Sequence, residues 1–412
     1  MQESRDKQTW LTPGVRGIGL ASFLSDVGHE VPTSLLPRFL TSTLGAPAAA
    51  LGLIEGISDG LAGLMRLAGG ALADDPSRRR NIAIGGYTST AVLTAAIGAA
   101  QTVWQVGLLR AGGWAARGLR VPARNALLAD AVDPSVYGRA YGFERAMDNL
   151  GAIGGPLLAL AFVAAFSVRT AILLSVIPGL LAAVAILYAI RHLQRVSIGE
   201  RQPIRLRIRP VLQGRLRRLM VGIAAFELGN VAATLLILRA TELLAQERSE
   251  DSATQIALVL YLAYNVAATL TSILAGRMSD SRGPVLVLSG GVAAFLVAYV
   301  IFAAVGPTVP ILAIAFLLAG VGIGCVETAE HSAVAGFAPA DIRGSAFGLL
   351  AAVQSFGNLA ASSIAGLLWT VVSPTAAFIY IAAWMAIALL ALMRSQLGAP
   401  RLLVLLRLHL CS

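Results

Sequence analysis

The sequence predicts an all-α integral membrane protein whose twelve transmembrane helices form two pseudo-symmetric six-helix bundles. Charged residues make up only 13% of the 412 residues, whereas a soluble domain carries about 25%. Mean hydropathy is +0.75, and apolar runs of about 20 residues, enough to cross a bilayer, follow one another along the chain. Similar motifs also recur at a constant spacing, which indicates two copies of one unit.

The repeat relates positions that are 206 residues apart (344 minus 138). The stretch GRAYG at 138–142 corresponds to GSAFG at 344–348, and GGALADDPSRRR at 69–80 corresponds to AGRMSDSRGP at 275–284. A constant offset of half the chain length is typical of an internal duplication.

Loops placed at charge clusters and at glycine or proline breaks separate the expected helices. The twelve spans are 17–40, 48–72, 81–101, 104–130, 138–166, 169–191, 217–239, 253–276, 284–305, 309–333, 344–370 and 374–393. The organisation that follows is an N-terminal bundle (1–192), a basic linker (193–216), a C-terminal bundle (217–394) and a tail (395–412).

Arginines gather in the loops after the second, fourth, sixth, eighth and tenth spans, and the loops after the first, third, ninth and eleventh carry no charge. The positive-inside rule therefore predicts a multi-pass protein of the plasma (inner) membrane with both termini in the cytoplasm. The net charge of +10 then reflects topology, so we expect a lipid bilayer as a partner and no nucleic acid.

Ionisable side chains inside the expected spans point to function, because each costs roughly 2.5–3.5 kcal/mol at the bilayer centre. We expect them to line a wet cavity that binds the substrate and protons, with Asp26 or Glu30 taking up the proton. The candidates in the first half are Asp26, His29, Glu30, Glu55, Asp59, Arg110, Arg117 and Asp148. Those in the second half are Glu227, Asn230, Asn265, Glu327, Glu330 and His331.

The loop after the second span predicts a cytoplasmic latch between the two halves. Its carboxylate can cap the positive end of a neighbouring helix, for which the expected eleventh span is a candidate, and its arginines can pair with an acid at the end of the fourth span. The latch residues are Gly70, Asp74, Arg78, Arg79 and Asp130 in the first copy and Gly276, Asp280 and Gly283 in the second.

This pattern resembles the major facilitator superfamily, whose loop motif is G-x-x-x-D-[RK]-x-G-[RK]-[RK]. Asp75 and Ser77 depart from that motif. The fifth span resembles the family's antiporter motif and is expected to pack helices closely through Gly142, Gly151, Gly155 and Pro156. The resemblance implies a secondary transporter that works by alternating access, and the antiporter motif implies export.

We therefore predict a proton-coupled exporter of a small organic compound that functions as a monomer. A divalent metal transporter remains an alternative, because Asp26 with His29 and Glu330 with His331 offer oxygen and nitrogen ligands. A membrane receptor that transports nothing is a second alternative. No nucleotide-binding or catalytic motif is recognisable, so we expect neither an enzyme nor a cofactor. Two cysteines so far apart, Cys325 and Cys411, predict no resident metal.

Overall fold

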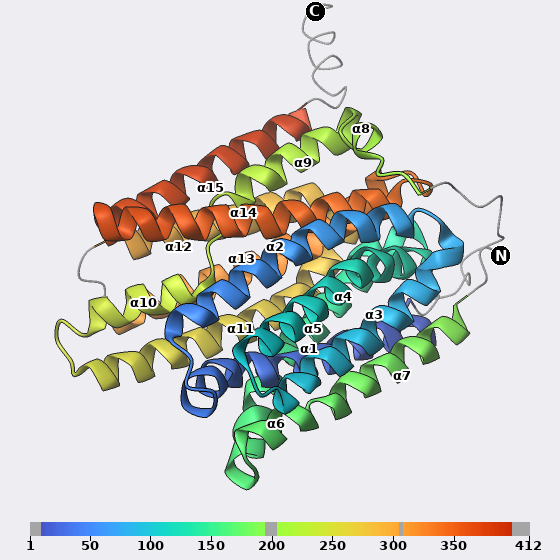
Figure 1. Ribbon diagram of the computed structural model, residues 1–412. Helices are drawn as coiled ribbons and strands as arrows, with labels where there is room; N and C mark the ends of the chain where they lie inside the picture. Colours follow the sequence, from blue (N-terminus) through green and yellow to red (C-terminus); the bar gives the residue numbers. More distant parts are fainter. Residues whose placement is uncertain (1–9, 194–203, 305–307, 398–412) are drawn as a thin grey trace, which may run out of the picture. The chain divides into compact units, whose positions relative to one another are not determined.

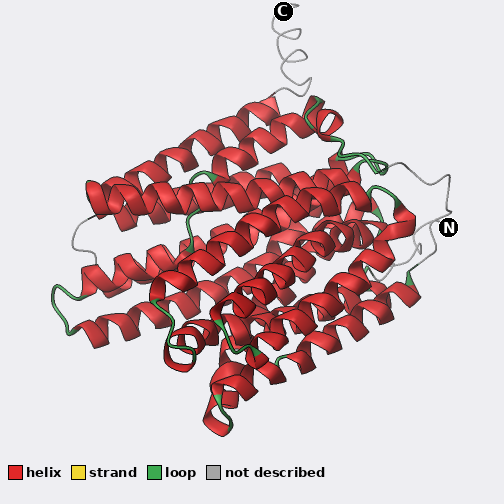
Figure 2. Ribbon diagram, in the orientation of Figure 1, coloured by secondary structure: helices red, strands yellow, loops and turns green. Residues whose placement is uncertain are grey.

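The computed structural model of the protein describes residues 10–193, 204–304 and 308–397, and every regular element in these ranges is a helix (Figures 1 and 2). Most of the predicted tail and the middle of the predicted linker lie outside the described residues. The chain divides into two compact units: Met1–Ile208 with Val334–Ser355, and Arg209–Ala333 with Phe356–Ser412.

The first unit contains the helices expected for the N-terminal half, close to the predicted bounds. They are α1 (Pro13–Arg38), α2 (Ala48–Ala73), α3 (Pro76–Ala96), α4 (Val103–Asp130), α5 (Tyr137–Ala165), α6 (Val168–Leu174) and α7 (Val176–His192). The predicted span 169–191 is interrupted at Ser175, the residue between α6 and α7.

The second unit holds most of the remaining helices. They are α9 (Gly214–Glu227), α10 (Ala233–Leu244), α11 (Glu250–Arg282), α12 (Pro284–Ala303), α13 (Val309–Phe337), α14 (Arg343–Val371) and α15 (Pro374–Leu397), with the short α8 (Ile208–Val211) at the boundary. The end of α13 and the first part of α14 group with the first unit, whereas the predicted bundle 217–394 places them in the second half.

The prediction of one continuous helix over 217–239 is wrong, because the chain breaks between α9 and α10. Two side chains of α14 bond to the backbone that the break exposes. The Ser362 hydroxyl accepts a hydrogen bond from the Ala232 N–H (2.9 Å), and the Asn358 amide donates one to the Asn230 carbonyl (2.8 Å). Non-helical backbone at membrane depth requires such partners.

Local signals explain where several helices begin and end. Asp75 caps α3 by accepting from the Ser77 N–H (2.9 Å), and Pro76 follows at the first helical position. Gly283 ends α11 with a φ of 90°, a left-handed conformation that favours glycine, and Pro284 starts α12.

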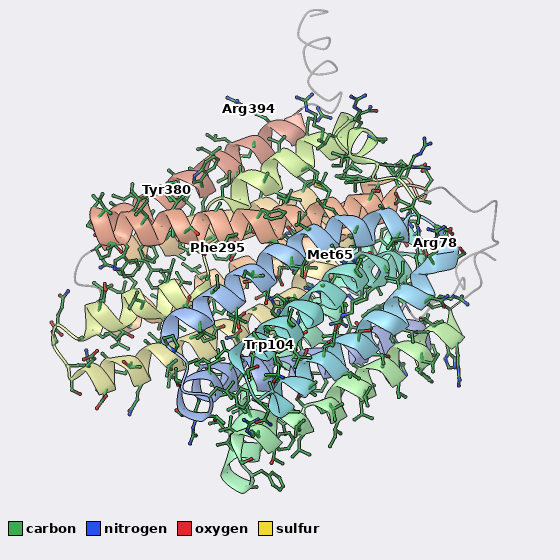
Figure 3. All side chains as sticks on the ribbon, viewed as in Figure 1. Met65, Arg78, Trp104, Phe295, Tyr380 and Arg394 are labelled. Atoms are coloured by element: carbon green, nitrogen blue, oxygen red, sulfur yellow. The ribbon has the colours of Figure 1, made fainter. Side chains whose placement is uncertain are left out.

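Eight of the described helical segments are long and apolar enough to cross a membrane by length and composition. Helices α1, α2 and α4 carry most of the ionisable residues singled out in the first half and fall outside that set. In the first unit, Arg78 lies near one end of the bundle and Trp104 near the other (Figure 3). Together with α1, α2, α4 and the broken α9–α10 segment, the eight apolar segments account for the twelve predicted spans of an all-α membrane protein.

Candidate functional site

Two arginines of α4 each pair with a carboxylate on another helix of the first unit. Arg117 Nη2 lies 3.0 Å from Asp26 Oδ1 on α1, and Arg110 Nη2 lies 3.0 Å from Glu55 Oε1 on α2. The two arginines are seven residues apart, which places them on one face of α4. In each pair one partner is buried (Asp26, Arg110) and the other is partly exposed (Arg117 22%, Glu55 30%). A charge in a low-dielectric region needs such an opposite partner.

Trp114 joins these pairs into one cluster, and the sequence prediction missed it. Its ring lies under the Arg110 guanidinium (4.2 Å to the ring centroid), and its indole N–H donates to Asp59 Oδ1. The His29 ring lies on it at 4.1 Å between centroids. The signal that could have revealed Trp114 is its spacing, four residues after Arg110 and three before Arg117, which places it on the arginine face.

Glu30 has a looser environment than Asp26. Its nearest ionisable neighbour is His29, with Nε2 3.9 Å from Glu30 Oε1, and 28% of the Glu30 side chain is exposed. No arginine in the described ranges lies within ion-pair distance of Glu30. The structure thus brings together a tightly paired carboxylate and a loosely held one on neighbouring turns of α1.

Glycines of α5 allow this part of α1 to approach closely. A Cβ placed on Gly151 would lie 2.8 Å from the Asp26 Cβ and 2.7 Å from the Phe23 carbonyl oxygen. A Cβ on Gly155 would overlap the Cβ of Glu30. Two glycines of the predicted packing motif therefore face the two acids, and Gly142 is buried in the same helix.

Asp148 belongs to a separate buried ion network. It pairs with Arg145 (Asp148 Oδ2 to Arg145 Nη1, 3.1 Å), and Glu144 binds both Arg145 and Arg124, the latter at 2.8 Å. Glu144 is fully buried and also accepts a hydrogen bond from Ser22 (2.6 Å). Every charge in this network has an opposite partner, which suits a structural role more than ligand binding.

The candidates of the second unit lie on α9, α11 and α13 and in the break after α9. The Asn230 amide donates to Glu227 Oε2 (3.0 Å) at the break after α9. Asn265 instead donates to the Tyr261 carbonyl of its own helix (2.9 Å). On α13, His331 Nδ1 lies 2.6 Å from the Glu327 carbonyl oxygen and 3.7 Å from Glu330 Oε1.

A second site lies where the turn between α2 and α3 meets the start of α14, which belongs to the same unit. Asp74 Oδ1 accepts from the Ser345 N–H (2.7 Å), and its other oxygen accepts from the Ser345 hydroxyl. The approach depends on glycines, because a Cβ on Gly70 would lie 2.7 Å from the Gly344 carbonyl oxygen and 2.8 Å from the Gly348 Cα. We call this site the α2–α14 contact.

Two arginines complete the α2–α14 contact around Asp130. Arg79 donates to Asp130 and to the Ala73 carbonyl (2.6 Å), and Arg343 donates to Asp130 from 3.3 Å. Of the two arginines predicted to pair with an acid at the end of the fourth span, Arg79 does so, whereas Arg78 pairs with Asp75 (3.2 Å).

Burial raises the pKa of Asp74 above its usual value, and the two hydrogen bonds from Ser345 partly offset that effect. Because the carboxyl is buried at this contact, its protonation depends on whether the contact is made.

The second copy of the loop motif has a different structure. Gly276 and Asp280 lie inside α11, which continues to Arg282, so the loop expected after residue 276 is helical. Gly283 ends that helix. The prediction that both copies form loops is therefore wrong for the second.

A metal site would need several ligands close together. In the described part of the chain, no three His, Cys, Asp or Glu side chains gather in that way. The pairs considered for a metal have other partners, since Asp26 binds Arg117 and His331 lies against a backbone carbonyl.

Comparisons with known proteins bear on the whole chain. The sequence model of the Major Facilitator Superfamily matches residues 18–244 and 219–402. Over 382 residues the chain is 27% identical to an uncharacterized MFS-type transporter of Methanocaldococcus jannaschii, covering 92% of this chain and 94% of that protein.

Solved structures share the fold at low sequence identity. A bacterial homologue of the iron transporter ferroportin, in an outward-facing state, superposes with a TM-score of 0.75 at 15% identity, covering 93% of this chain and 99% of that one. The fucose:proton symporter of E. coli superposes with a TM-score of 0.71 at 15% identity, covering 94% and 99%.

Proposed function

Because the chain belongs to the major facilitator superfamily and is a transporter of that family, we propose that it exports a small organic compound in exchange for protons. The observation that carries this proposal is the Asp26–Arg117 pair with Glu30 one turn away. An ionised carboxylate in a poorly hydrated site needs its cationic partner, so separation of Asp26 from Arg117 would favour proton binding.

The arrangement of α1, α4 and α5 supports such coupling. Asp26 and Glu30 lie against the glycines of α5, while the partner arginine comes from α4. A small shift of α1 relative to α4 would change the pair without any unfolding. The fucose:proton symporter of E. coli shows that this fold can host proton coupling.

The proposed direction of transport and orientation in the membrane rest on sequence patterns. The Gly151, Gly155 and Pro156 spacing resembles that of antiporters, and the arginine-rich loops favour cytoplasmic termini in the inner membrane. The α2–α14 contact would then lie on the cytoplasmic side, where it would latch the outward-facing state.

The test begins with a thermal-shift screen of the purified protein against organic solutes and divalent metals, since a bound ligand stabilises the native state. Flux of each hit is then measured in proteoliposomes with and without a pH gradient. We expect the Asp26→Asn, Glu30→Gln double variant to lose gradient-driven flux, and Asp133→Asn, an exposed loop change, to keep it.

Unchanged gradient-driven flux in the double variant would refute the coupling role. A screen in which only divalent metals stabilise the protein would favour metal transport instead. Ligand binding with no flux under any gradient would favour a receptor.

A further inference from the structure

A small cavity inside the first unit is not explained by the transport site. It lies between α1, α3 and α7 and has a volume of about 10 Å³. Its lining residues are Ser25, Gly28, His29, Tyr87, Thr90, Ala91, Thr94 and Gly179. Two of these, Gly28 and Gly179, let α1 and α7 approach closely beside the cavity, since a Cβ on Gly28 would lie 2.8 Å from the Gly179 nitrogen.

Three polar atoms on this cavity have no hydrogen-bond partner among the protein groups. They are His29 Nδ1, the Tyr87 hydroxyl and the Thr90 hydroxyl, and each residue is at most 5% exposed. An unsatisfied buried polar group costs about 1–3 kcal/mol. Three of them around one cavity therefore indicate a ligand that both donates and accepts hydrogen bonds.

We propose that this cavity binds one water molecule through His29 Nδ1, Tyr87 and Thr90. A buried water needs roughly 10–15 Å³ and makes about three hydrogen bonds, which matches the volume and the partners. A cation is disfavoured, because the buried Arg120 guanidinium lies 3.7 Å from the Tyr87 ring centroid and donates to Ser25 (2.6 Å).

The hydrogen bonds around His29 define what the water does. The Thr33 hydroxyl donates to the His29 carbonyl (2.9 Å) and accepts from Arg110 (3.1 Å), which leaves one lone pair as an acceptor 3.5 Å from His29 Nε2. The ring then carries its proton on Nε2 and presents the Nδ1 lone pair to a water hydrogen. The water thereby holds the imidazole with its N–H on the side of Glu30 and its face on Trp114.

His29 is thus a positioning residue for Glu30 and Trp114. This consequence rests on the proposed function, whereas the water site itself does not. The titratable and charged groups that face the imidazole are Glu30 on α1, Tyr87 on α3, and Arg110, Arg117 and Arg120 on α4.

The experiment uses nitrogen NMR of the full-length protein labelled at its four histidines, with the His29→Gln variant to assign the signal. We expect a protonated Nε2 and an Nδ1 that accepts a hydrogen bond. The Tyr87→Phe, Thr90→Val double variant should move the Nδ1 signal toward that of a free lone pair. Thr94→Val changes another residue of the same cavity, whose hydroxyl is not among the fully buried unpartnered atoms of the described residues, and should leave it in place.

A protonated Nδ1 in the wild type, or the same Nδ1 signal in wild type and double variant, would overturn the proposal. If the double variant does not fold, an experimental density map of the wild-type protein decides whether the cavity holds a water. It should show density within hydrogen-bond distance of His29 Nδ1, and an empty cavity in a map that resolves other buried waters would refute the site. Neither readout requires a transport substrate, so a failure here leaves the proposed function standing.

Discussion

In each unit an arginine donates hydrogen bonds to the carbonyl oxygens at the end of a helix, although the two arginines are not at equivalent positions of the repeat. In the first, Arg169 donates to the carbonyls of Gly98 (3.1 Å) and Ala100 (2.6 Å), where α3 ends. In the second, Arg239 donates to Phe302 (3.0 Å) and Ala304 (3.3 Å), where α12 ends. Helix ends leave carbonyls without partners, so both units satisfy the same need from different helices.

By the repeat offset of 206, Thr375 occupies the position of Arg169, and it is itself a partner of Arg239 (3.5 Å). The two halves thus supply corresponding helix ends with an arginine donor from different helices, α6 in the first half and α10 in the second. A local comparison of the repeats shows only an arginine at one position and a threonine at its equivalent.

Replacing Arg239 by leucine should destabilise the protein. The change leaves the Phe302 and Ala304 carbonyls without this donor, at a cost of about 1–3 kcal/mol. We expect a lower melting temperature of the detergent-purified protein than for Arg248→Leu, which removes an exposed arginine. Equal melting temperatures of the two variants would show that the Arg239 hydrogen bonds contribute nothing to stability.

Asp74 should make the α2–α14 contact sensitive to pH. Its pKa is raised at the contact by burial, so making the contact favours proton binding. The contact should therefore be most stable below the usual aspartate pKa and weaken as pH rises through the raised value. Hydrogen exchange of the Ser345 amide, corrected for its intrinsic pH dependence, measures this change.

The Asp74→Asn variant should lose that pH dependence, because the amide does not titrate. Asp133→Asn is the matched control, since Asp133 also accepts from a serine N–H, that of Ser135 (2.9 Å), but is exposed. The same pH slope in wild type and Asp74→Asn would mean that another group governs the contact.

At the scale of elements, α5 shows how small residues position functional ones. Gly151 and Gly155 bring α5 against α1 at Asp26 and Glu30, and such close approach favours helix association in lipid. The α2–α14 contact repeats the device with Gly70, Gly344 and Gly348. In both places the glycines decide how close two helices come, and the distance decides which polar groups meet.

Gly155→Ala should therefore impair transport more than it impairs folding. The added methyl group overlaps the Glu30 Cβ, so α1 must shift where the acids lie. Flux of an identified substrate should fall by about tenfold or more, as expected when site geometry moves by about 1 Å. Gly85→Ala on α3, whose Cβ meets nothing within 4 Å, should keep full flux, and equal flux in both would contradict the packing role.

At the scale of the whole molecule, the arginine-rich loops predict the orientation in the membrane. Arg78 and Trp104 lie near opposite ends of the first unit (Figure 3). In a background without Cys325 and Cys411, Arg78→Cys should react with an impermeant maleimide only in inverted vesicles. Trp104→Cys, at a residue that is 63% exposed, should react in intact cells, and the reverse pattern would refute cytoplasmic termini.

The prediction was strongest where the signal is local. Helices α2, α4, α5 and α12 lie within a few residues of the expected spans, because apolar length and loop charge are properties of adjacent residues. The break after Glu227 could not be predicted, because its partner Ser362 is 130 residues away from Ala232. Trp114 was recognisable by spacing, but its contact with His29 depends on how α1 packs near α4.

The sequence by itself determined that this chain spans a membrane in two related halves, with acids and arginines inside the first. Hydropathy, charge and repeat spacing carry that information without any knowledge of packing. Only the tertiary structure decided that Asp26 pairs with Arg117 while Glu30 has no arginine partner among the described residues, and that His29 faces a cavity. The physical reason is distance: ion pairs and hydrogen bonds act over a few ångströms, and helix packing sets which groups come that close.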